Sequence, residues 1–427
     1  ARQCDACGQI YETTTLVNPI CKICGNTPII RETTHWYLQL DDFRQQLTGW
    51  IAGKGYWKEN VRNFMLNLLE QGLIERPITR DLSWGVPVPL PETEGKVLYV
   101  WFDAPIGYIS STVEWAERIG QPERWKDYWL DPETKLVHFI GKDNIIFHAL
   151  IWPAMLMGQE QGYCLPHDIP ANEFMNLEGQ KISGSRNWAV WARDFLTRYD
   201  PDPLRYYLTV AMPESKDTDW DWEDFYKRNN DELVATWGNL ANRVLAFTYK
   251  HWDGQIPDPG ELTDIDRELI ATVDEGFQTV GAELEAVHLR AALNEAMRLA
   301  GEVNRYLDIT APWQAIKTNR TEAARAVFTA LRAINSLKIL LSPFLPFTSE
   351  KLHRIMGYDQ PLFGAQKVQQ VTDSLGEHTV LTYDATPATG TWQPAEIQPG
   401  QVLHQPVPLF RKLEPKIIEE ERARLGS

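Results

Sequence analysis

Two segments of the chain combine aromatic rings with groups that can donate or accept hydrogen bonds. Residues 99–108 read YVWFDAPIGY, and residues 138–153 read HFIGKDNIIFHALIWP. Each begins in an apolar run typical of a strand, and ligands of parallel sheets bind at the carboxyl ends of the strands. Taken singly, Trp101 and Phe147 could be core residues, and His148 an ordinary helix histidine. Together the two segments predict one binding crevice.

A third segment, residues 179–187, reads GQKISGSRN and is small and polar. It offers the ammonium of Lys181, the hydroxyls of Ser183 and Ser185, and backbone N–H groups. Such a loop can bind phosphates. Short strings of this kind also occur by chance, so the loop alone is weak support for a phosphate site.

Four cysteines near the start of the chain have the spacing of a metal site. Cys4 and Cys7 form one CxxC pair, and Cys21 and Cys24 form another. Each pair can present two thiolates to a tetrahedral ion, and four thiolates close its coordination sphere. The pattern therefore predicts a structural Zn²⁺, against the alternative of four unliganded thiols. Cys164 is alone and is interpreted as a plain thiol.

The order of apolar patterns indicates which elements position these groups. Short apolar runs alternate with helical spacing from residue 96 to 153, which is typical of strand–helix–strand units and a parallel sheet. After about Asp224 only amphipathic helices follow, and one of them is expected to start at Thr321 and to end before Pro343. The tail from residue 368 to 408 resembles an extended strap, and a charged helix follows at 415–425.

Composition limits the classes of partner. The 427 residues carry a formal charge of −16, which disfavours a general polyanion binder and any DNA partner. The sequence contains no run of eighteen apolar residues, so no membrane partner is expected. The first residues resemble neither a signal peptide nor an initiator segment, and the CxxC pairs suit a reducing compartment, so we expect a cytoplasmic protein.

In these strings the sequence resembles methionyl-tRNA synthetases. It shares with them YVWFDAPIGY, HFIGKDNIIFH with WPAM, GQKISGSRNWAVW, DPLRYYL, NNDELVATWGNLANRVL and APW, in the family's order. The resemblance implies a Rossmann-like class I α/β catalytic domain, a zinc-knuckle insertion and an α-helical anticodon-binding bundle. It also implies ATP-dependent activation of L-methionine, assisted by Mg²⁺, and transfer of the methionyl group to tRNA(Met).

The resemblance assigns roles to individual residues. The pocket for methionine would be lined by Trp101, Ala104, Pro105, Tyr108, Phe147, His148 and Trp152, with Asp143 also contacting the substrate. An apolar slot alone discriminates weakly between amino acids that differ by about one methylene. A polar contact to the thioether sulfur is therefore expected, from the Tyr108 hydroxyl or a His148 ring nitrogen.

The resemblance also implies how ATP is held. Lys181, Ser183 and Ser185 would close over the triphosphate as catalytic residues, while Gly141 and Ile182 would contact ATP. The family's loop reads Lys-Met-Ser-Lys-Ser, whereas this chain has Gly184 at the second lysine. One of two cations is thereby lost, and Arg186 is the nearest substitute.

In the helical part, Asn239 and Arg243 are four residues apart and so share a helix face. By themselves they could form an ordinary solvated face. By resemblance they read the CAU anticodon together with Pro312 and Trp313, because unstacked bases are held by aromatic stacking and edge hydrogen bonds.

The expected domains are a zinc knuckle at 1–35, the second half of the catalytic domain at 36–225, an anticodon-binding domain at 226–365, and a C-terminal strap and helix at 366–427. The family's other signature, His-x-Gly-His, is absent from the chain and would lie before Ala1. The CxxC pairs could be paired locally or shared with cysteines upstream. A catalytically inactive tRNA-binding fragment or paralogue is the alternative function.

Overall fold

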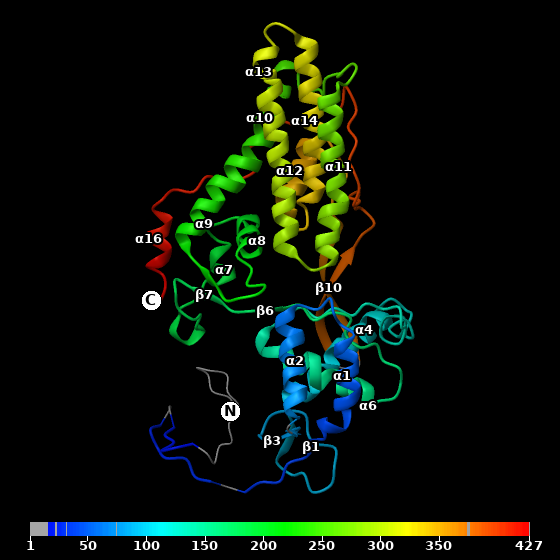
Figure 1. Cartoon of the computed structure of the whole chain (residues 1–427), viewed down its shortest axis with the longest axis vertical. Helices are drawn as coiled ribbons and strands as arrows, with labels where there is room; N and C mark the ends of the chain where they lie inside the picture. Colours follow the sequence, from blue (N-terminus) through cyan, green and yellow to red (C-terminus); the bar gives the residue numbers. More distant parts are fainter. Residues whose placement is uncertain (1–15, 22–23, 31, 74, 374–375, 427) are drawn as a thin grey trace. The chain divides into compact units, whose positions relative to one another are not determined.

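The computed structural model describes residues 16–426 except 22–23, 31, 74 and 374–375, and the chain forms two compact units, Ala1–Ala171 and Asn172–Ser427 (Figure 1). The division at residue 171 falls inside the span 36–225 expected as one catalytic part, so the expected domain limits stay a prediction. Among the described residues, no helix is long and apolar enough to cross a membrane.

The core of the first unit is built around two amphipathic helices, α1 (Arg44–Ala52) and α2 (Glu59–Gln71). On α2 the residues Val61, Met65 and Leu69 follow one another at four-residue spacing and are all buried, which places one apolar stripe against the core. The same core contains Ala149, Leu150 and Ile151 of a π-helical turn, η4 (Phe147–Ile151), which continues into α6 (Trp152–Gly158).

The strands of the first unit are short and pair two by two. β1 (Tyr37–Leu38) is antiparallel to β2 (Arg76–Pro77), and β3 (Thr79–Asp81) is antiparallel to β4 (Lys96–Leu98). β5 (Ile140–Gly141) is paired with β6 (Ala171–Asn172), next to a parallel bridge between Val137 and Asp168. The expected alternation of strands and helices is therefore present. The expected strand through residues 99–102 is wrong, and the described strands of this unit form two-stranded pairs, two of them antiparallel, rather than the expected parallel sheet.

That strand ends at Leu98 because the backbone turns at Tyr99. The Tyr99 carbonyl accepts hydrogen bonds from the N–H groups of Phe102 and Asp103, at 2.7 and 3.3 Å, which starts the short helix α3 (Val100–Asp103). Pro105, whose fixed φ suits a helix start, then precedes α4 (Ile106–Arg118). The aromatic, β-branched composition of this run predicts a strand, but these local bonds decide the outcome. Short helical segments at α5 (Lys126–Trp129) and η3 (Lys142–Asn144) complete the unit.

The second unit begins with a parallel pair, β7 (Met175–Leu177) and β8 (Thr218–Trp220). The connection between them holds the loop 178–187, a 3-10 turn η5 (Gly184–Arg186), and the helices α7 (Ala192–Phe195) and α8 (Pro201–Val210). Their buried aromatic rings form one cluster with α9 (Trp222–Arg228). The members of this aromatic cluster include Phe195, Tyr199, Tyr207, Trp220, Trp222 and Phe225.

From α9 to α15 every element is helical, as the periodicity predicts. The segments are a π-helical stretch η6 (Asn229–Gly238), which runs directly into α10 (Asn239–His251), then α11 (Asp264–Glu285), α12 (Leu289–Thr310), α13 (Pro312–Ala315), α14 (Arg320–Leu340) and α15 (Pro346–Ile355). Figure 1 shows α11, α12 and α14 side by side. Most side chains of α14 are buried, because helices and the C-terminal segment surround it.

The expected start of α14 is wrong by two residues. The N-cap is Asn319, whose side-chain oxygen accepts a hydrogen bond from the Glu322 N–H at 3.2 Å, so Thr321 lies inside the first turn. Asn caps helices as well as Thr does, and the choice between them depends on the path of the preceding chain.

The expected extended tail contains a β-hairpin. β9 (Ala365–Asp373) is antiparallel to β10 (Gly376–Asp384). The chain then runs along the bundle, where Leu403, Leu409 and Phe410 are buried. The expected terminal helix is confirmed as α16 (Ile417–Arg422), and its Glu421 accepts hydrogen bonds from the Arg198 guanidinium at 2.7 and 2.9 Å.

Candidate functional site

Tyr108 and His148 form the polar centre of the predicted pocket in the first unit. The Tyr108 hydroxyl lies 2.8 Å from His148 Nε2, and His148 Nδ1 lies 3.1 Å from the Asn144 carbonyl oxygen. A carbonyl only accepts, so Nδ1 carries the proton and Nε2 accepts the hydrogen bond from Tyr108. Burial lowers the pKa of His148, which keeps the ring neutral near pH 7.

Aromatic rings surround this pair. The rings of Trp101 and Phe147 stack with centroids 4.8 Å apart and an angle of 18° between their planes. The Trp152 ring is buried, and its centroid lies 6.4 Å from that of Tyr108. These side chains come from α3, α4, the π-helical turn and α6, so the structure brings together residues from both predicted segments.

The remaining predicted residues of these segments lie at their turns. Pro105 is buried and Ala104 is exposed at the start of α4. Gly141 ends β5, and a Cβ added there would lie only 2.8 Å from the Oδ1 atom of Asp143. A side chain at Gly141 would thus meet that carboxylate, and the Asp143 side chain would have to shift.

The sequence analysis did not select His138, although it lies in one of the predicted segments. Its ring is buried, and its centroid lies 4.9 Å from that of Tyr108 and 5.2 Å from that of His148. Burial, and to a smaller degree the nearby His148, lowers its pKa to about 4. A second histidine in the string HFIGKDNIIFH was the available signal, but only the structure shows that both rings meet Tyr108.

The predicted phosphate loop lies in the second unit and is closed like a small hairpin. Ser183 and Trp188 exchange two backbone hydrogen bonds, at 2.9 and 3.0 Å. Within it the hydroxyl oxygens of Ser183 and Ser185 are 3.3 Å apart. Lys181 and Ile182 are exposed, and the ammonium of Lys181 lies 5.8 Å from the centre of the Phe174 ring. The ammonium and both hydroxyls therefore belong to one accessible loop.

At Gly184, where the family's loop has its second lysine, the neighbouring Arg186 is bonded to the loop. The side chain of Arg186 donates a hydrogen bond from Nη2 to the Lys181 carbonyl oxygen at 3.3 Å. The Arg186 guanidinium is thereby held against the loop backbone. At Gly184 itself, an added Cβ would lie 3.4 Å from the Trp191 ring. A cation is present beside the loop even though the second lysine is not.

In the helical part, Arg243 and Trp313 are in contact. The Arg243 guanidinium lies 4.5 Å from the centre of the Trp313 ring, and its Nη2 lies 3.4 Å from the Asn304 side-chain oxygen. Asn239 and Arg243 are both exposed and line a hollow of about 340 Å³ with Asn304. Pro312 begins α13 after Ala311, which adopts a left-handed φ of 39°. The four predicted anticodon residues thus lie on α10 and α13.

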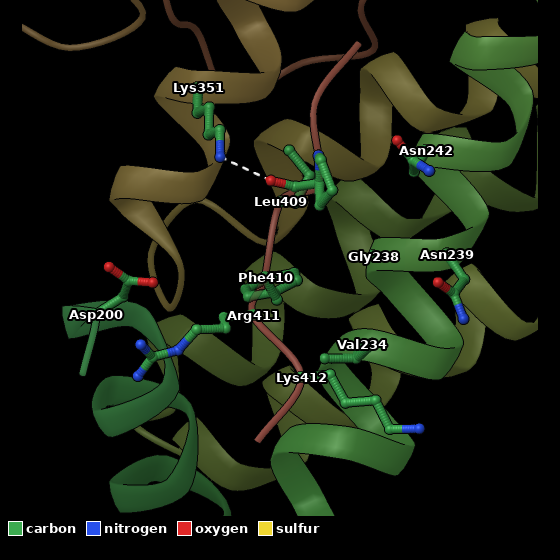
Figure 2. A pocket seen from close by; sticks show the side chains of 11 residues that line it. Asp200, Val234, Gly238, Asn239, Asn242, Lys351, Leu409, Phe410, Arg411 and Lys412 are labelled. Carbon is green, nitrogen blue, oxygen red and sulfur yellow. Dashed lines mark hydrogen bonds between the residues drawn. The ribbon is translucent and has the colours of Figure 1, made fainter. Parts of the chain in front are cut away.

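A larger groove of about 510 Å³ adjoins this hollow, and Asn239 lines both (Figure 2). Two of its three cations are held by neutral acceptors: Lys351 Nζ donates to the Pro408 carbonyl at 2.7 Å, and Arg411 Nη2 donates to the Arg198 carbonyl at 2.7 Å. Carbonyl partners hold these charges in place without cancelling them. The lining residues are Asp200, Val234, Gly238, Asn239, Asn242, Lys351, Pro408, Leu409, Phe410, Arg411 and Lys412.

Comparisons with known proteins match the whole chain. The family model for class I tRNA synthetases of the M type matches residues 1–245, and the model for the anticodon binding domain of methionyl tRNA ligase matches residues 256–386. A methionine–tRNA ligase of Thermomicrobium roseum is 50% identical over 425 residues, which cover 99% of this chain and 73% of the relative. This chain belongs to the methionine–tRNA ligase family. A relative from Chloroflexus aggregans is 47% identical, over 100% of this chain and 74% of its own.

Solved methionyl-tRNA synthetases share the fold. The Mycobacterium tuberculosis enzyme bound by methionyl-adenylate has a TM-score of 0.73 and 25% identity, over 92% of this chain and 72% of that one. Its free form has a TM-score of 0.71 and 26% identity, over 89% and 69%. The predicted class I catalytic fold with a helical anticodon domain is confirmed by these matches.

The predicted zinc ligands are described only in part. Cys4 and Cys7 lie outside the described residues. Cys21 and Cys24 lie in a tight turn, in which the Gly25 N–H donates to the Cys21 carbonyl and the Cys21 N–H donates to the Asn26 carbonyl, both at 2.8 Å. Gly25 has a φ of +72°, which glycine adopts at little cost.

Proposed function

We propose that this protein activates L-methionine with ATP and transfers the methionyl group to tRNA(Met) in the cytoplasm. The observation that carries the proposal is the pocket in which the Tyr108–His148 hydrogen bond adjoins the stacked rings of Trp101 and Phe147, in a chain of the methionine–tRNA ligase family. Soft aromatic faces beside a hydroxyl suit a thioether side chain, because sulfur contacts aromatic rings favourably.

In the first step a carboxylate oxygen of methionine attacks the α-phosphorus of ATP, the bond to pyrophosphate breaks, and methionyl-adenylate forms. In the second step a terminal ribose hydroxyl of tRNA attacks the activated carbonyl, and AMP leaves. No side-chain nucleophile takes part, so the protein contributes alignment and stabilisation of phosphate charge. Mg²⁺ carried by ATP would share that charge.

The residues of the first unit would align methionine. The Trp101 and Phe147 rings, together with Ala104, Pro105 and Trp152, would hold the side chain, and the Asp143 carboxylate would accept a hydrogen bond from the α-ammonium group. Because Gly141 carries no side chain, its backbone would let the adenosine approach closely. What supports these roles is the clustering of the rings and the position of Asp143 beside Gly141.

The loop of the second unit would act on the triphosphate. The ammonium of Lys181 would approach the phosphate oxygens, and the hydroxyls of Ser183 and Ser185 would donate to them, with Ile182 against the nucleotide. Arg186 would supply the cation that Gly184 cannot. This role is supported by exposure of the lysine and by the Arg186–Lys181 hydrogen bond.

The helical unit would bind the CAU anticodon of tRNA(Met) through Asn239, Arg243, Pro312 and Trp313. An unstacked base can lie on the Trp313 ring, while the Asn239 amide and the Arg243 guanidinium bond base edges or phosphates. The adjoining groove adds cations fixed by carbonyls, which suits the RNA backbone beside those bases.

We also propose that Cys4, Cys7, Cys21 and Cys24 hold a structural Zn²⁺ in a knuckle within residues 1–35. The turn at the second pair suits this role, and Zn–S distances of about 2.3 Å are expected. Metal analysis of carefully reduced protein should find about one zinc per chain if all four bind one ion. A zinc-free preparation with all thiols reduced would contradict local pairing.

The rest of the proposed organisation follows the expected limits: the catalytic part at 36–225, the anticodon domain at 226–365 and the strap at 366–427.

The central experiment is methionine-dependent exchange between ATP and labelled pyrophosphate, measured on the full-length protein beside aminoacylation of tRNA(Met). Exchange and charging together are the expected result. The second candidate, a catalytically inactive tRNA binder, is favoured only by Gly184 in the phosphate loop. It predicts tight tRNA(Met) binding with no exchange at saturating methionine, and that outcome would overturn the proposal.

A further inference from the structure

The loop proposed to act on the triphosphate begins at an unusual turn. Leu177 and Gln180 exchange two backbone hydrogen bonds, at 2.8 and 3.0 Å, across the two residues between them. Both of these central residues, Glu178 and Gly179, have left-handed φ values, of 49° and 73°. Such a turn favours small residues, and left-handed backbone at a glutamate persists only where other contacts hold it. The contacts of Glu178 therefore show what fixes the start of the loop.

Both carboxylate oxygens of Glu178 are engaged. Oε1 accepts a hydrogen bond from the Trp222 N–H at the start of α9, at 2.9 Å. Oε2 accepts one from Arg422 Nε, also at 2.9 Å, and Arg422 lies on α16, 244 residues further along the chain. Because the Glu178 side chain is only 15% exposed, this ion pair is screened less by solvent than a surface pair.

The same part of the chain holds the far end of the loop. Residues 417–426, here called the α16 segment, include Gly426, whose N–H donates to the Asn187 carbonyl oxygen at 3.0 Å. Asn187 directly follows the turn η5 and also has a left-handed φ, of 51°. The α16 segment is thus bonded to both ends of the loop, at Glu178 and at Asn187, while Lys181 between them is exposed.

The α16 segment is itself firmly anchored. Arg198 Nε and Nη2 donate to the two carboxylate oxygens of Glu421, at 2.7 and 2.9 Å. The Tyr199 hydroxyl donates to the same carboxylate at 2.9 Å, and Glu421 is buried. Two parallel charge-assisted bonds fix geometry as well as adding stability. Arg422, the next residue, is therefore held in a defined position from which it can fix the loop.

We propose that Arg422 and Glu178 are positioning residues, whose ion pair fixes the loop at residues 178–187 for the reaction with ATP. The fixed loop presents the Lys181 ammonium and the two serine hydroxyls to the triphosphate as one unit. The proposal rests on the proposed function, because it concerns the loop that acts on ATP. Catalysis by alignment is sensitive to displacements of about 1 Å, so a loosened loop slows adenylate formation.

The first measurement is deuterium uptake by the loop amides of the full-length protein. Arg422→Met keeps the side-chain stem and removes the guanidinium, whereas Glu178→Gln removes the charge and leaves α16 untouched. Lys416→Met is the matched control, because Lys416 forms an ion pair with Glu420 of α16, at 3.6 Å. We expect uptake across residues 180–188 to become about 5- to 20-fold faster in the first two variants and to change less than twofold in the control. Unchanged uptake in both Arg422→Met and Glu178→Gln would overturn the proposal.

The second measurement is methionine-dependent pyrophosphate exchange in two backgrounds. In the otherwise unchanged protein, Arg422→Met should lower kcat about 5- to 20-fold and leave the KM for methionine within twofold. In a Lys181→Ala background it should cost less than twofold further, because the cation that the loop places is already gone. Residues that act as a unit are not additive in this way. Equal losses in the two backgrounds would show that Arg422 acts on stability, and would refute a positioning role.

The two ideas fail separately, because deuterium uptake requires no catalysis. A protein whose loop loosens in Arg422→Met, but which exchanges no pyrophosphate in any form, would refute the proposed activity alone. Normal pyrophosphate exchange in Arg422→Met and Glu178→Gln, with deuterium uptake unchanged, would refute the positioning role alone.

Discussion

Replacing Tyr108 by Phe removes one oxygen atom, and its effect can be worked out from the hydrogen-bond chain through His148. The lost hydroxyl lies 2.8 Å from His148 Nε2, and the His148 side chain is only 3% exposed. In the free protein water can replace the hydroxyl, because Tyr108 itself is 41% exposed. Methionine would expel that water, so the unpaired acceptor costs about 1–3 kcal/mol on binding rather than on folding.

That free energy corresponds to a loss of roughly 5- to 150-fold in kcat/KM for methionine, since about 1.4 kcal/mol is a factor of ten. Pyrophosphate exchange at varied methionine and varied ATP measures it, and the KM for ATP should not change. Tyr128→Phe is the matched control, because Tyr128 is exposed in the same unit and its ring packs on Trp115. The reasoning is refuted if Tyr108→Phe activates methionine within twofold of the wild type, or if both KM values rise together.

Two further predictions concern the helical unit. Arg243→Ala or Trp313→Ala should lower kcat/KM for tRNA charging roughly 10- to 100-fold, which corresponds to the free energy of stacking one base on an aromatic ring. Pyrophosphate exchange should not change. Equal losses in both assays would show that these residues act through fold stability. Lys338 lies 2.8 Å from His353 Nδ1, and burial lowers the pKa of its ammonium group to about 7 from 10.5. Between these values the unfolded chain binds the extra proton, so stability rises with pH. Lys338→Met should remove roughly 2 kcal/mol of the gain between pH 7 and 9 in urea unfolding; an unchanged gain would contradict a buried neutral amine.

The helical unit could be predicted from sequence because its signal is long and repeated. On α12 the apolar positions Leu293, Ala296, Ala300 and Val303 recur at helical spacing, and all are buried. Twenty-two residues of consistent periodicity leave little room for another interpretation. The cap of α14 was less predictable, since it depends on which of two neighbouring polar residues the incoming chain directs at the free N–H groups.

The pocket was predictable by composition but not by geometry. The sequence indicates that Tyr108 and His148 line the same pocket. It does not show that the Tyr108 hydroxyl donates to His148, or that the N–H of His148 is bonded to the backbone. His148 lies in a π-helical turn, and its Nδ1 is bonded to the Asn144 carbonyl, which leaves Nε2 to accept from Tyr108; the periodicity of ordinary helices does not predict such a turn. His138 was missed for the same reason, because only the fold brings its ring against those of Tyr108 and His148.

The acidic composition and RNA binding are compatible because this chain partners its cations in two ways. On α12, Arg298 is paired with the Glu295 carboxylate, so its charge is largely cancelled. Around α10, by contrast, Arg243 contacts an amide and an aromatic ring, and Lys351 contacts a carbonyl. Neutral partners fix a cation in position but leave its field available to phosphates. Since the rest of a chain of charge −16 repels RNA, we expect these cations to favour binding at the surface beside the residues proposed to bind the anticodon, so that the acidic charge would add specificity.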